Sequence, residues 1–461
     1  MKFIFNHIRF IDKKLTIFVI VFHLLNAVVF VPIALIIFTM KDFFYVKNAK
    51  KKMVFTARVK RIFSVALFLV ISLICVLYRY PLLVVLATIH FVPFSLILSN
   101  LLLSPYENYT QNKFLKEASS KLHKINPIVI GVTGSMGKTS TKHILAHILS
   151  TNLSVLFTPG SINTKMGITR IIREKLSQEH KYFVVEMGAY FKGSIKKLCD
   201  FVEPKYGIIT AIGDSHYEFF KSREAVASTK FELGECVTKN DGFLIINNNI
   251  EDNLIPDNIN LIKIGDISNI TQKQDGLHFT YKNEEVFAPI FGEHQATNIV
   301  LAIEIAIKLG MPFKTILVSL NTLPQITHRL EVKNQGDNII IDDAYNSNFE
   351  GFKSGLNLLQ VFDNKKKVLI TPGMVELGTK HDELHYEIGK IAAEKTDVTV
   401  LVKSSRIPTF VKGFKETNKN SQLVEVDSFA KAQEWMSNNL HNSAILLEND
   451  LPDVFESSLS L

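Results

Sequence analysis

The chain has 461 residues, a formal net charge of +8 and an apolar fraction of 47%, a length sufficient for two or three domains. Much of the basic surplus borders apolar runs near the front of the chain, where lysines meet anionic headgroups. No basic-aromatic nucleic-acid module is evident, so we predict no nucleic-acid partner. The three cysteines show no CxxC spacing, which argues against a disulfide framework or a zinc site and agrees with a reducing compartment.

Three long runs without Asp, Glu, Lys or Arg occupy residues 15–40, 62–78 and 80–106. Even the second and shortest run extends over roughly 26 Å as a helix, close to the thickness of a membrane core. Residues 1–106 are therefore predicted to form a membrane segment of about three transmembrane helices. The first run is too long for a cleavable signal peptide, and no small-residue cleavage site follows it.

The connection between the first two runs predicts the orientation. Residues 41–61 carry eight basic residues against one acid, Asp42, which favours a cytoplasmic position. Residues 62–106 would then form a hairpin that returns the chain to the cytoplasm. Two interpretations of the first run stay open: a full crossing, which leaves basic residues outside, or a re-entrant pair broken at Pro32.

A glycine-rich loop follows, since residues 131–140 read GVTGSMGKTS. The loop lies between a β-branched run at 127–130 and a run with helical spacing at 142–149, which is the context of a phosphate-binding loop. Lys138 would reach a nucleotide's terminal phosphates and the Thr139 hydroxyl would bind Mg²⁺. The spacing G-x-x-G-x-x-G-K-T is a variant of the general pattern. An ordinary glycine turn is the alternative, and it requires all these features to coincide by chance.

Beyond this loop, short apolar runs alternate with longer amphipathic ones, as is typical of α/β layers with a largely parallel sheet. The first series has predicted strands at 182–186, 206–210 and 243–247 and a helix at 296–309. The second series has predicted strands at 338–343, 367–371, 397–401 and 443–448. The predicted order is a connector at 107–126, a central P-loop ATPase-type α/β domain at 127–321 and a C-terminal Rossmann-like α/β domain at 322–461.

Polar residues that end apolar strands are the first candidates for ligand contacts, because open α/β sheets bind ligands beyond the carboxyl ends of their strands. Glu186 ends one strand and could ligate Mg²⁺, or it could cap a helix. His216 follows the next strand and Lys230 lies in a helical run; alone, they look like a solvated histidine and a surface lysine. Residues 342–348 (DDAYNSN) could bind a ribose and a purine or form an Asx-rich turn. Arg329 could touch phosphates or simply be exposed.

Together these motifs resemble the Mur ligase family, ATP-dependent ligases that join amino acids or peptides to a carboxylate. The matching segments occur in the family's order over residues 127–450: the phosphate loop at 131–139, Glu-Met-Gly at 186–188, Gly-x-x-His at 213–216, the lysine helix at 229–233, the Gly-x-His-Asn-x-x-Asn element at 292–298 and the Gly-Arg segment at 328–331. Residues 342–348 and 371–378, with His385 downstream, are most similar to members that add D-alanyl-D-alanine to UDP-N-acetylmuramoyl-tripeptide.

The resemblance implies roles for individual residues. The implied nucleotide contacts are Gly134, Gly137, Lys138, Thr139, Ser140, Asn298 near adenine, Arg329 on the terminal phosphate, Asp343 near ribose, Tyr345 and Asn346. The implied Mg²⁺ ligands are Thr139, Glu186, His216 and a carbamylated Lys230, and the implied catalytic residues are Lys138, Lys230, His216 and Arg329. A carbamate at Lys230 would supply oxygen ligands, whereas a cationic amine beside Mg²⁺ would be repelled.

The resemblance further implies an enzyme that forms an acyl phosphate from ATP and ligates D-alanyl-D-alanine to UDP-N-acetylmuramoyl-tripeptide in peptidoglycan synthesis. The expected location is the bacterial inner membrane, with the catalytic domains facing the cytoplasm and other cell-wall synthesis proteins as candidate partners. Two alternatives stay open: another amide ligase of the superfamily, such as a polyglutamate-forming one, and a non-catalytic membrane scaffold with a nucleotide switch.

Several positions depart from the family pattern. Gln295 replaces an Asn, Phe349 stands where a Pro usually follows Asn348, and 372–373 read Pro-Gly in place of Gly-Asp. We also expect no UDP-sugar-binding domain of the usual kind, because only the connector separates the predicted hairpin from the first catalytic strand. How the nucleotide-sugar end would be held is therefore not predicted.

Overall fold

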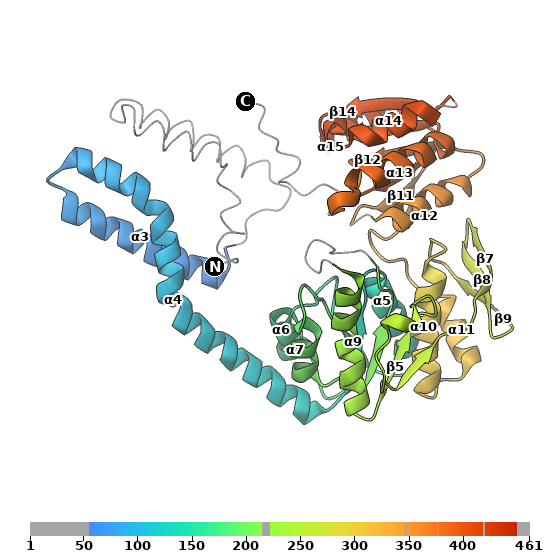
Figure 1. Ribbon diagram of the computed structural model, residues 1–461, viewed down its shortest axis with the longest axis horizontal. Helices are drawn as coiled ribbons and strands as arrows, with labels where there is room; N and C mark the ends of the chain where they lie inside the picture. Colours follow the sequence, from blue (N-terminus) through green and yellow to red (C-terminus); the bar gives the residue numbers. More distant parts are fainter. Residues whose placement is uncertain (1–54, 214–221, 346–347, 376, 418–419, 450–461) are drawn as a thin grey trace. The chain divides into compact units, whose positions relative to one another are not determined.

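The computed structural model describes residues 55–213, 222–345, 348–375, 377–417 and 420–449 (Figure 1). The chain divides into two units, residues 1–113 with 452–461, and residues 114–451. The second unit contains two α/β domains, so the mixed α/β class predicted from the sequence is confirmed. The first apolar run, 15–40, lies outside the described residues.

In the first unit, helices α3 (Ala57–Leu77) and α4 (Pro81–Ile125) form the predicted hairpin. Arg61 near the start of α3 forms an ion pair of 2.7 Å with Glu107 inside α4, which links the start of α3 to the middle of α4. Among the described residues, one helix, α3, is long and apolar enough to cross a membrane, and only 6% of its most apolar window is buried. The third predicted run forms the first half of α4. Three membrane helices are therefore not established.

The residues predicted as a connector, 107–126, are almost entirely helical, because α4 continues without a break to Ile125. Ala118 and Leu122 on this part of α4 are buried in the core of the following domain. The Lys121 ammonium donates a hydrogen bond of 2.8 Å to the Arg173 carbonyl oxygen. The end of α4 is thus packed as a part of the middle domain.

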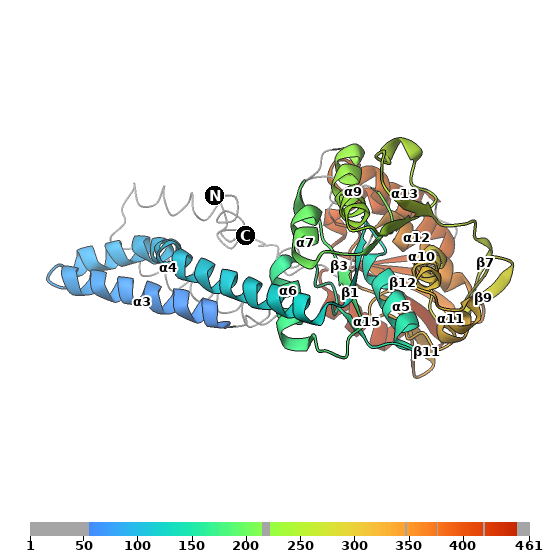
Figure 2. The ribbon, with the colours of Figure 1, turned by 90° about the horizontal axis from the view of Figure 1, so that it is seen from below.

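The middle domain is built on a six-stranded parallel sheet in the order β2-β3-β1-β4-β5-β6. The strands are β1 (Ile128–Thr133), β2 (Val155–Phe157), β3 (Tyr182–Glu186), β4 (Tyr206–Ile209), β5 (Phe243–Ile246) and β6 (Leu261–Lys263). Helices α5 (Lys138–Ser150), α10 (Gln295–Lys308) and α11 (Phe313–Leu320) cover one face. Helices α6 (Lys165–Lys175), α7 (Ser194–Val202) and α9 (Arg223–Lys239) cover the other, as Figure 2 shows for the two helical layers.

A three-stranded antiparallel sheet, which the sequence analysis did not predict, extends the middle domain. It consists of β7 (Ser268–Lys273), β8 (Gly276–Tyr281) and β9 (Glu284–Ala288). Leu277, Phe279 and Val286 from this sheet join the core beneath α10. The turn residues Lys282 and Asn283 both have positive φ angles, of 50° and 63°, as a tight hairpin of the primed type requires.

The C-terminal domain has a second six-stranded sheet in the order β10-β11-β15-β12-β13-β14, parallel except for the edge strand β10. The strands are β10 (Glu331–Gln335), β11 (Asn338–Asp343), β12 (Lys366–Thr371), β13 (Val398–Val402), β14 (Gln422–Val426) and β15 (Ser443–Glu448). Helices α12 (Phe349–Gln360), α13 (His381–Lys395) and α14 (Pro408–Thr417) cover one face, and α15 (Phe429–Asn439) covers the other. Every strand predicted from an apolar run is present, but β10 and β14 of this domain, and β2 and β6 of the middle domain, were not predicted.

Candidate active site

The glycine-rich loop joins β1 to the N-terminus of α5, as the sequence predicts. Gly134 and Gly137 lie in the loop, where a Cβ atom on Gly134 would meet the Thr210 Oγ1 atom at 1.9 Å and one on Gly137 would meet the Asn298 Oδ1 atom at 2.4 Å. Gly137 also has a φ of +79°, a conformation that suits glycine. Gly131 instead lies within β1, where a Cβ would meet the Leu233 side chain at 2.8 Å. The first glycine of the motif therefore serves packing rather than the loop.

Lys138, at the first position of α5, is folded back over the loop. Its ammonium donates to the carbonyl oxygens of Gly134 at 2.7 Å and Ser135 at 3.2 Å. Burial lowers the pKa of Lys138 to about 8, an effect that the charge of Arg329 reinforces and that of Glu186 opposes. An ammonium held at the mouth of a phosphate loop is placed to meet a nucleotide's phosphates.

Glu186 ends β3 beside this loop and is almost fully buried. One carboxylate oxygen, Oε2, accepts from the Thr139 hydroxyl at 3.0 Å and from the Lys142 ammonium at 2.9 Å, and Oε1 accepts from the Asn163 amide at 3.2 Å. The alternative in which Glu186 caps a helix does not apply. Sequence analysis missed Lys142 and Asn163, and no local pattern distinguishes this buried lysine from an ordinary helical one.

Lys230 lies in α9 with only 3% of its surface exposed. Burial lowers the pKa of Lys230 to about 7, and the charge of Lys138 contributes further. The interpretation of Lys230 as a surface lysine is therefore wrong. His216 lies outside the described residues, so its predicted place beside the site remains a prediction.

Asn298 and Gln295 on α10 lie against the start of α5. The Asn298 Oδ1 atom accepts from the Thr141 hydroxyl at 3.1 Å, and its Nδ2 atom donates to the Gln295 Oε1 atom at 2.8 Å. Gln295 also donates to the buried Ser140 hydroxyl at 3.4 Å. The Gln that replaces the family's Asn thus belongs to a hydrogen-bonded set that supports the first turn of α5.

Arg329 lies in the segment that joins the two α/β domains. Its guanidinium stacks over the Tyr345 ring with the Cζ atom 4.3 Å from the ring centre, and the Tyr345 hydroxyl hydrogen-bonds to Ser161. Burial raises the pKa of Asp343, at the end of β11, to about 7 against the opposing charge of Arg329. Asn346 lies outside the described residues. The structure therefore brings Arg329, Asp343 and Tyr345 together, and their predicted contacts with a nucleotide stay a prediction.

The loop after β12 is held by buried groups of its own domain. The Met374 N–H donates to the His385 Nε2 atom at 2.9 Å, and His385 Nδ1 lies 2.7 Å from the His381 carbonyl oxygen. The Asn449 amide donates to the Gly373 carbonyl oxygen at 2.7 Å. His385, which the sequence analysis noted only as part of the resemblance, is thus one of the side chains that hold this loop, together with Asn449.

Comparisons with known proteins agree with this geometry. Residues 132–306 match the Mur ligase middle domain. A UDP-N-acetylmuramoyl-tripeptide--D-alanyl-D-alanine ligase from Mycobacterium bovis is 30% identical over 298 residues, which cover 59% of this chain and 58% of the relative. The corresponding ligase from Bacillus subtilis is 32% identical over 295 residues, or 61% of this chain and 64% of the relative. The chain therefore spans less than two thirds of the length of these curated relatives.

Solved structures share the fold at lower identity. MurF from Acinetobacter baumannii superposes with a TM-score of 0.65 at 23% identity, covering 76% of this chain and 78% of that one. MurF from Thermotoga maritima, solved in complex with ADP, gives a TM-score of 0.64 at 24% identity, covering 75% and 81%. The resemblance inferred from the motifs is confirmed: residues 132–306 match the Mur ligase middle domain, and over a longer stretch the chain is similar to UDP-N-acetylmuramoyl-tripeptide--D-alanyl-D-alanine ligases.

Proposed function

We propose that this chain is an ATP-dependent carboxylate–amine ligase that adds D-alanyl-D-alanine to UDP-N-acetylmuramoyl-tripeptide. The observation that carries the proposal is the cluster around the phosphate loop. The Lys138 ammonium bonds the loop itself, and the Thr139 hydroxyl bonds Glu186. The buried Lys230 lies close enough for the charge of Lys138 to lower its pKa. The similarity to curated ligases of that specificity supports the choice of substrates.

The chemistry needs a positive environment around transferring phosphates. A substrate carboxylate would attack the γ-phosphorus of ATP, releasing ADP and forming an acyl phosphate; the amine of the dipeptide would then displace phosphate as the amide bond forms. Lys138 and Arg329 would bind the phosphate oxygens and stabilise the charge that develops there. Holding both substrates in the orientation that the reaction needs would account for much of the rate enhancement over the reaction in solution.

The donor set suits a magnesium ion. Thr139 and Glu186 offer a hydroxyl and a carboxylate oxygen 3.0 Å apart, and oxygen donors are those that Mg²⁺ prefers. Mg²⁺, when bound there with ATP, neutralises phosphate charge. Lys142 bonds the same Glu186 oxygen at 2.9 Å, so this lysine would hold the carboxylate in its place on the loop.

Lys230 fits the proposed carbamate. A buried amine with a pKa of about 7 is substantially neutral at physiological pH, and only the neutral amine can attack CO₂. The neutral amine forms an N–C bond to CO₂ and releases one proton to give an anionic carbamate, whose negative charge is attracted by Lys138 where an ammonium would be repelled. We therefore propose that Lys230 is carbamylated in the active protein.

We further propose that the chain is attached to the bacterial cytoplasmic membrane through its front segment, with both α/β domains in the cytoplasm. Support comes from the apolar exposed surface of α3 and from the basic residues of 41–61. Attachment would hold the ligase near a membrane-bound step that consumes its product.

The full-length protein in detergent, with ATP, Mg²⁺ and pairs of acceptor and amine, tests the ligase proposal. We expect phosphate release that depends on both UDP-N-acetylmuramoyl-tripeptide and D-alanyl-D-alanine, with the ligated product found by mass spectrometry. Turnover with glutamate and a glutamyl acceptor would identify a polyglutamate-forming ligase instead. Nucleotide binding without product from any pair would favour the scaffold alternative.

A further inference from the structure

The segment that carries Arg329 has an unusual backbone. Its two neighbours, His328 and Leu330, are not glycines, yet both adopt left-handed conformations, with φ angles of 58° and 51°. Such angles are disfavoured for residues with a Cβ atom and persist where the surroundings impose them. The backbone on both sides of Arg329 is therefore held in place by something other than its own preference.

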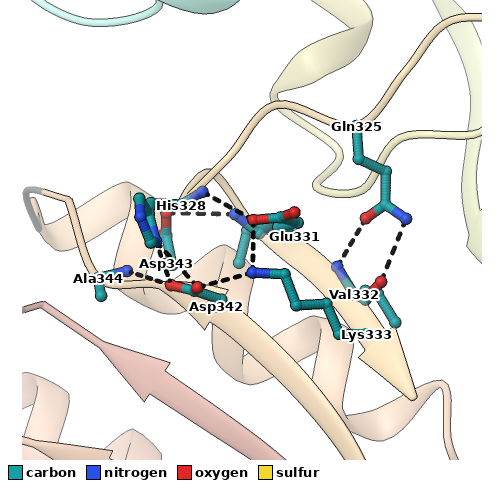
Figure 3. Close-up of polar contacts among 9 residues, drawn as sticks. Gln325, His328, Glu331, Val332, Lys333, Asp342, Asp343 and Ala344 are labelled. Carbon is teal, nitrogen blue, oxygen red and sulfur yellow. Dashed lines mark hydrogen bonds and ion pairs between the residues drawn. The ribbon is translucent and has the colours of Figure 1, made fainter. Parts of the chain in front are cut away.

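Two consecutive carboxylates at the end of β11 provide this restraint. The His328 Nδ1 atom lies 3.0 Å and 2.9 Å from the two carboxylate oxygens of Asp342, and the Leu330 N–H donates to the Asp343 Oδ1 atom at 3.3 Å. Figure 3 shows His328 directly above Asp342, with Asp343 alongside. Each neighbour of Arg329 is thus bonded to its own aspartate.

A second pair of charged residues closes the network. The Lys333 ammonium lies 3.1 Å from the Asp342 Oδ2 atom and 2.8 Å from the Glu331 Oε2 atom. The same Glu331 oxygen accepts from the His328 N–H at 3.2 Å. His328, Glu331, Lys333 and Asp342, which we call the brace, therefore form a closed cycle (Figure 3).

The outer end of the segment is fixed as well. Gln325 donates to the Val332 carbonyl oxygen at 3.2 Å and accepts from the Val332 N–H at 2.6 Å. The turn that carries Arg329 is also closed by the Arg329 N–H, which donates to the Ile326 carbonyl oxygen at 3.0 Å. The five residues between Gln325 and β10 are held at several points along their length.

A metal site is the alternative interpretation of this cluster, because ligand atoms of His328, Glu331 and Asp342 lie within 4.8 Å of one another. All three candidate ligands are already engaged, however: the Lys333 ammonium bonds both acids, and the His328 Nδ1 atom bonds Asp342, so a cation would have to displace both partners. These existing bonds therefore favour the brace over a metal site.

We propose that the brace is a positioning device that sets the place of Arg329 toward the terminal phosphate of the nucleotide. This inference rests on the proposed function, which assigns Arg329 to that phosphate. The reason is geometric: a guanidinium at the end of a long side chain inherits any error in its backbone, and displacement by about an ångström can lower a rate by roughly a hundredfold.

The experiment compares the affinities of the full-length protein for MgADP and for Mg²⁺ with a non-hydrolysable ATP analogue, by calorimetry. Arg329→Ala should remove the preference for the triphosphate. His328→Gly, which permits the left-handed backbone but deletes the imidazole, should lower that preference by about five- to tenfold. His328→Asn should retain it, because Asn tolerates this conformation and its amide nitrogen takes the Nδ1 position.

Asp427→Asn is the matched control, since it removes an exposed carboxylate from a lysine pair in the same domain and should change nothing. In the Arg329→Ala background, His328→Gly should have no further effect on triphosphate preference, since the two act through one contact. A persistent effect there, or an unchanged preference in His328→Gly alone, would overturn the brace.

Zn²⁺ titration separates the metal alternative. If wild-type protein binds Zn²⁺ and Glu331→Gln abolishes that binding, the cluster is a metal site and the brace is wrong. If wild-type protein binds neither nucleotide, the proposed function fails, and the brace fails with it. If wild-type protein prefers the triphosphate and the brace variants keep that preference, only the brace is refuted.

Discussion

Lys138 is the residue on which the proposed nucleotide chemistry would depend most directly. Its ammonium bonds two carbonyl oxygens of the phosphate loop rather than any core group. Lys138→Ala should therefore lower ATP turnover by at least about a hundredfold, the usual scale for loss of a group that stabilises developing charge, while leaving the thermal midpoint nearly unchanged. The control is Lys431→Ala, at an exposed lysine of α15. Phosphate release near the wild-type rate would refute the phosphate-loop assignment.

Lys230 is more deeply buried than Lys138, and its pKa is lowered further, to about 7 instead of about 8. Lys230→Ala should lose most activity, and added bicarbonate should not restore it. A short carboxylic acid in solution should restore part, because it supplies the oxygens of the missing carbamate. In ¹³C-bicarbonate, wild-type protein should show a carbamate carbon signal by NMR that the variant lacks. A fully active Lys230→Ala protein would show that this lysine has no part in the reaction.

At the scale of elements, helix α13 and the loop after β12 are coupled through one histidine. Because His385 Nε2 accepts from the Met374 N–H, the ring must carry its proton on Nδ1 and stay neutral. Burial is the main cause that lowers the pKa of His385 to about 4. The loop geometry therefore depends on a histidine that cannot be protonated without losing a hydrogen bond.

This coupling predicts an acid sensitivity with a definite sign. The unfolded chain, with a histidine pKa near 6.5, binds more protons than the folded one between about pH 6.5 and pH 4, so stability is lost as the pH falls. At pH 5 the loss from His385 should be about 2 kcal/mol. Urea unfolding at pH 7 and pH 5 should show a smaller loss for His385→Gln than for wild-type protein. Equal losses would mean that His385 is not held neutral.

At the scale of the whole molecule, the end of α4 belongs to the unit that contains the candidate active site. Residues 114–451 form one unit, and Ala118 and Leu122 of α4 are buried in its core. A chain that begins at Asn112 should therefore be soluble and should retain a kcat close to that of the full protein in detergent. The front segment would then serve the proposed membrane attachment alone.

A shorter chain that begins at residue 127 is the matched comparison. It loses the docked turns of α4, and burial of Leu122 alone is worth about 2 kcal/mol, so it should unfold at a lower temperature. If the chain from Asn112 binds ATP but cannot use UDP-N-acetylmuramoyl-tripeptide, the front segment helps to hold the substrate and the attachment-only interpretation is wrong. Comparing kcat and KM of the two proteins distinguishes these outcomes.

Sequence patterns that extend over only a few residues were enough to predict much of the fold. The phosphate loop and the buried strands were found because glycine spacing, β-branched runs and helix periodicity act over a few residues. The residues around Arg329 and Asp343 were found from their motifs. The β7–β9 sheet was missed, although Asp275-Gly276 and the Lys282-Asn283 pair are turn signals that could have indicated it.

What only the tertiary structure decided are the properties that depend on distant partners. Lys142 and Glu186 are far apart in sequence yet form a buried ion pair of 2.9 Å, and a buried charge is tolerated only where a partner and hydrogen bonds meet it. Lys230 looks like a surface lysine until packing removes its solvent, which lowers its pKa. The polar segment 107–126 looked like a connector because its sequence does not reveal that Ala118 and Leu122 face a core. Local chemistry thus determined which residues could act, and long-range packing determined their charge, their neighbours and their place.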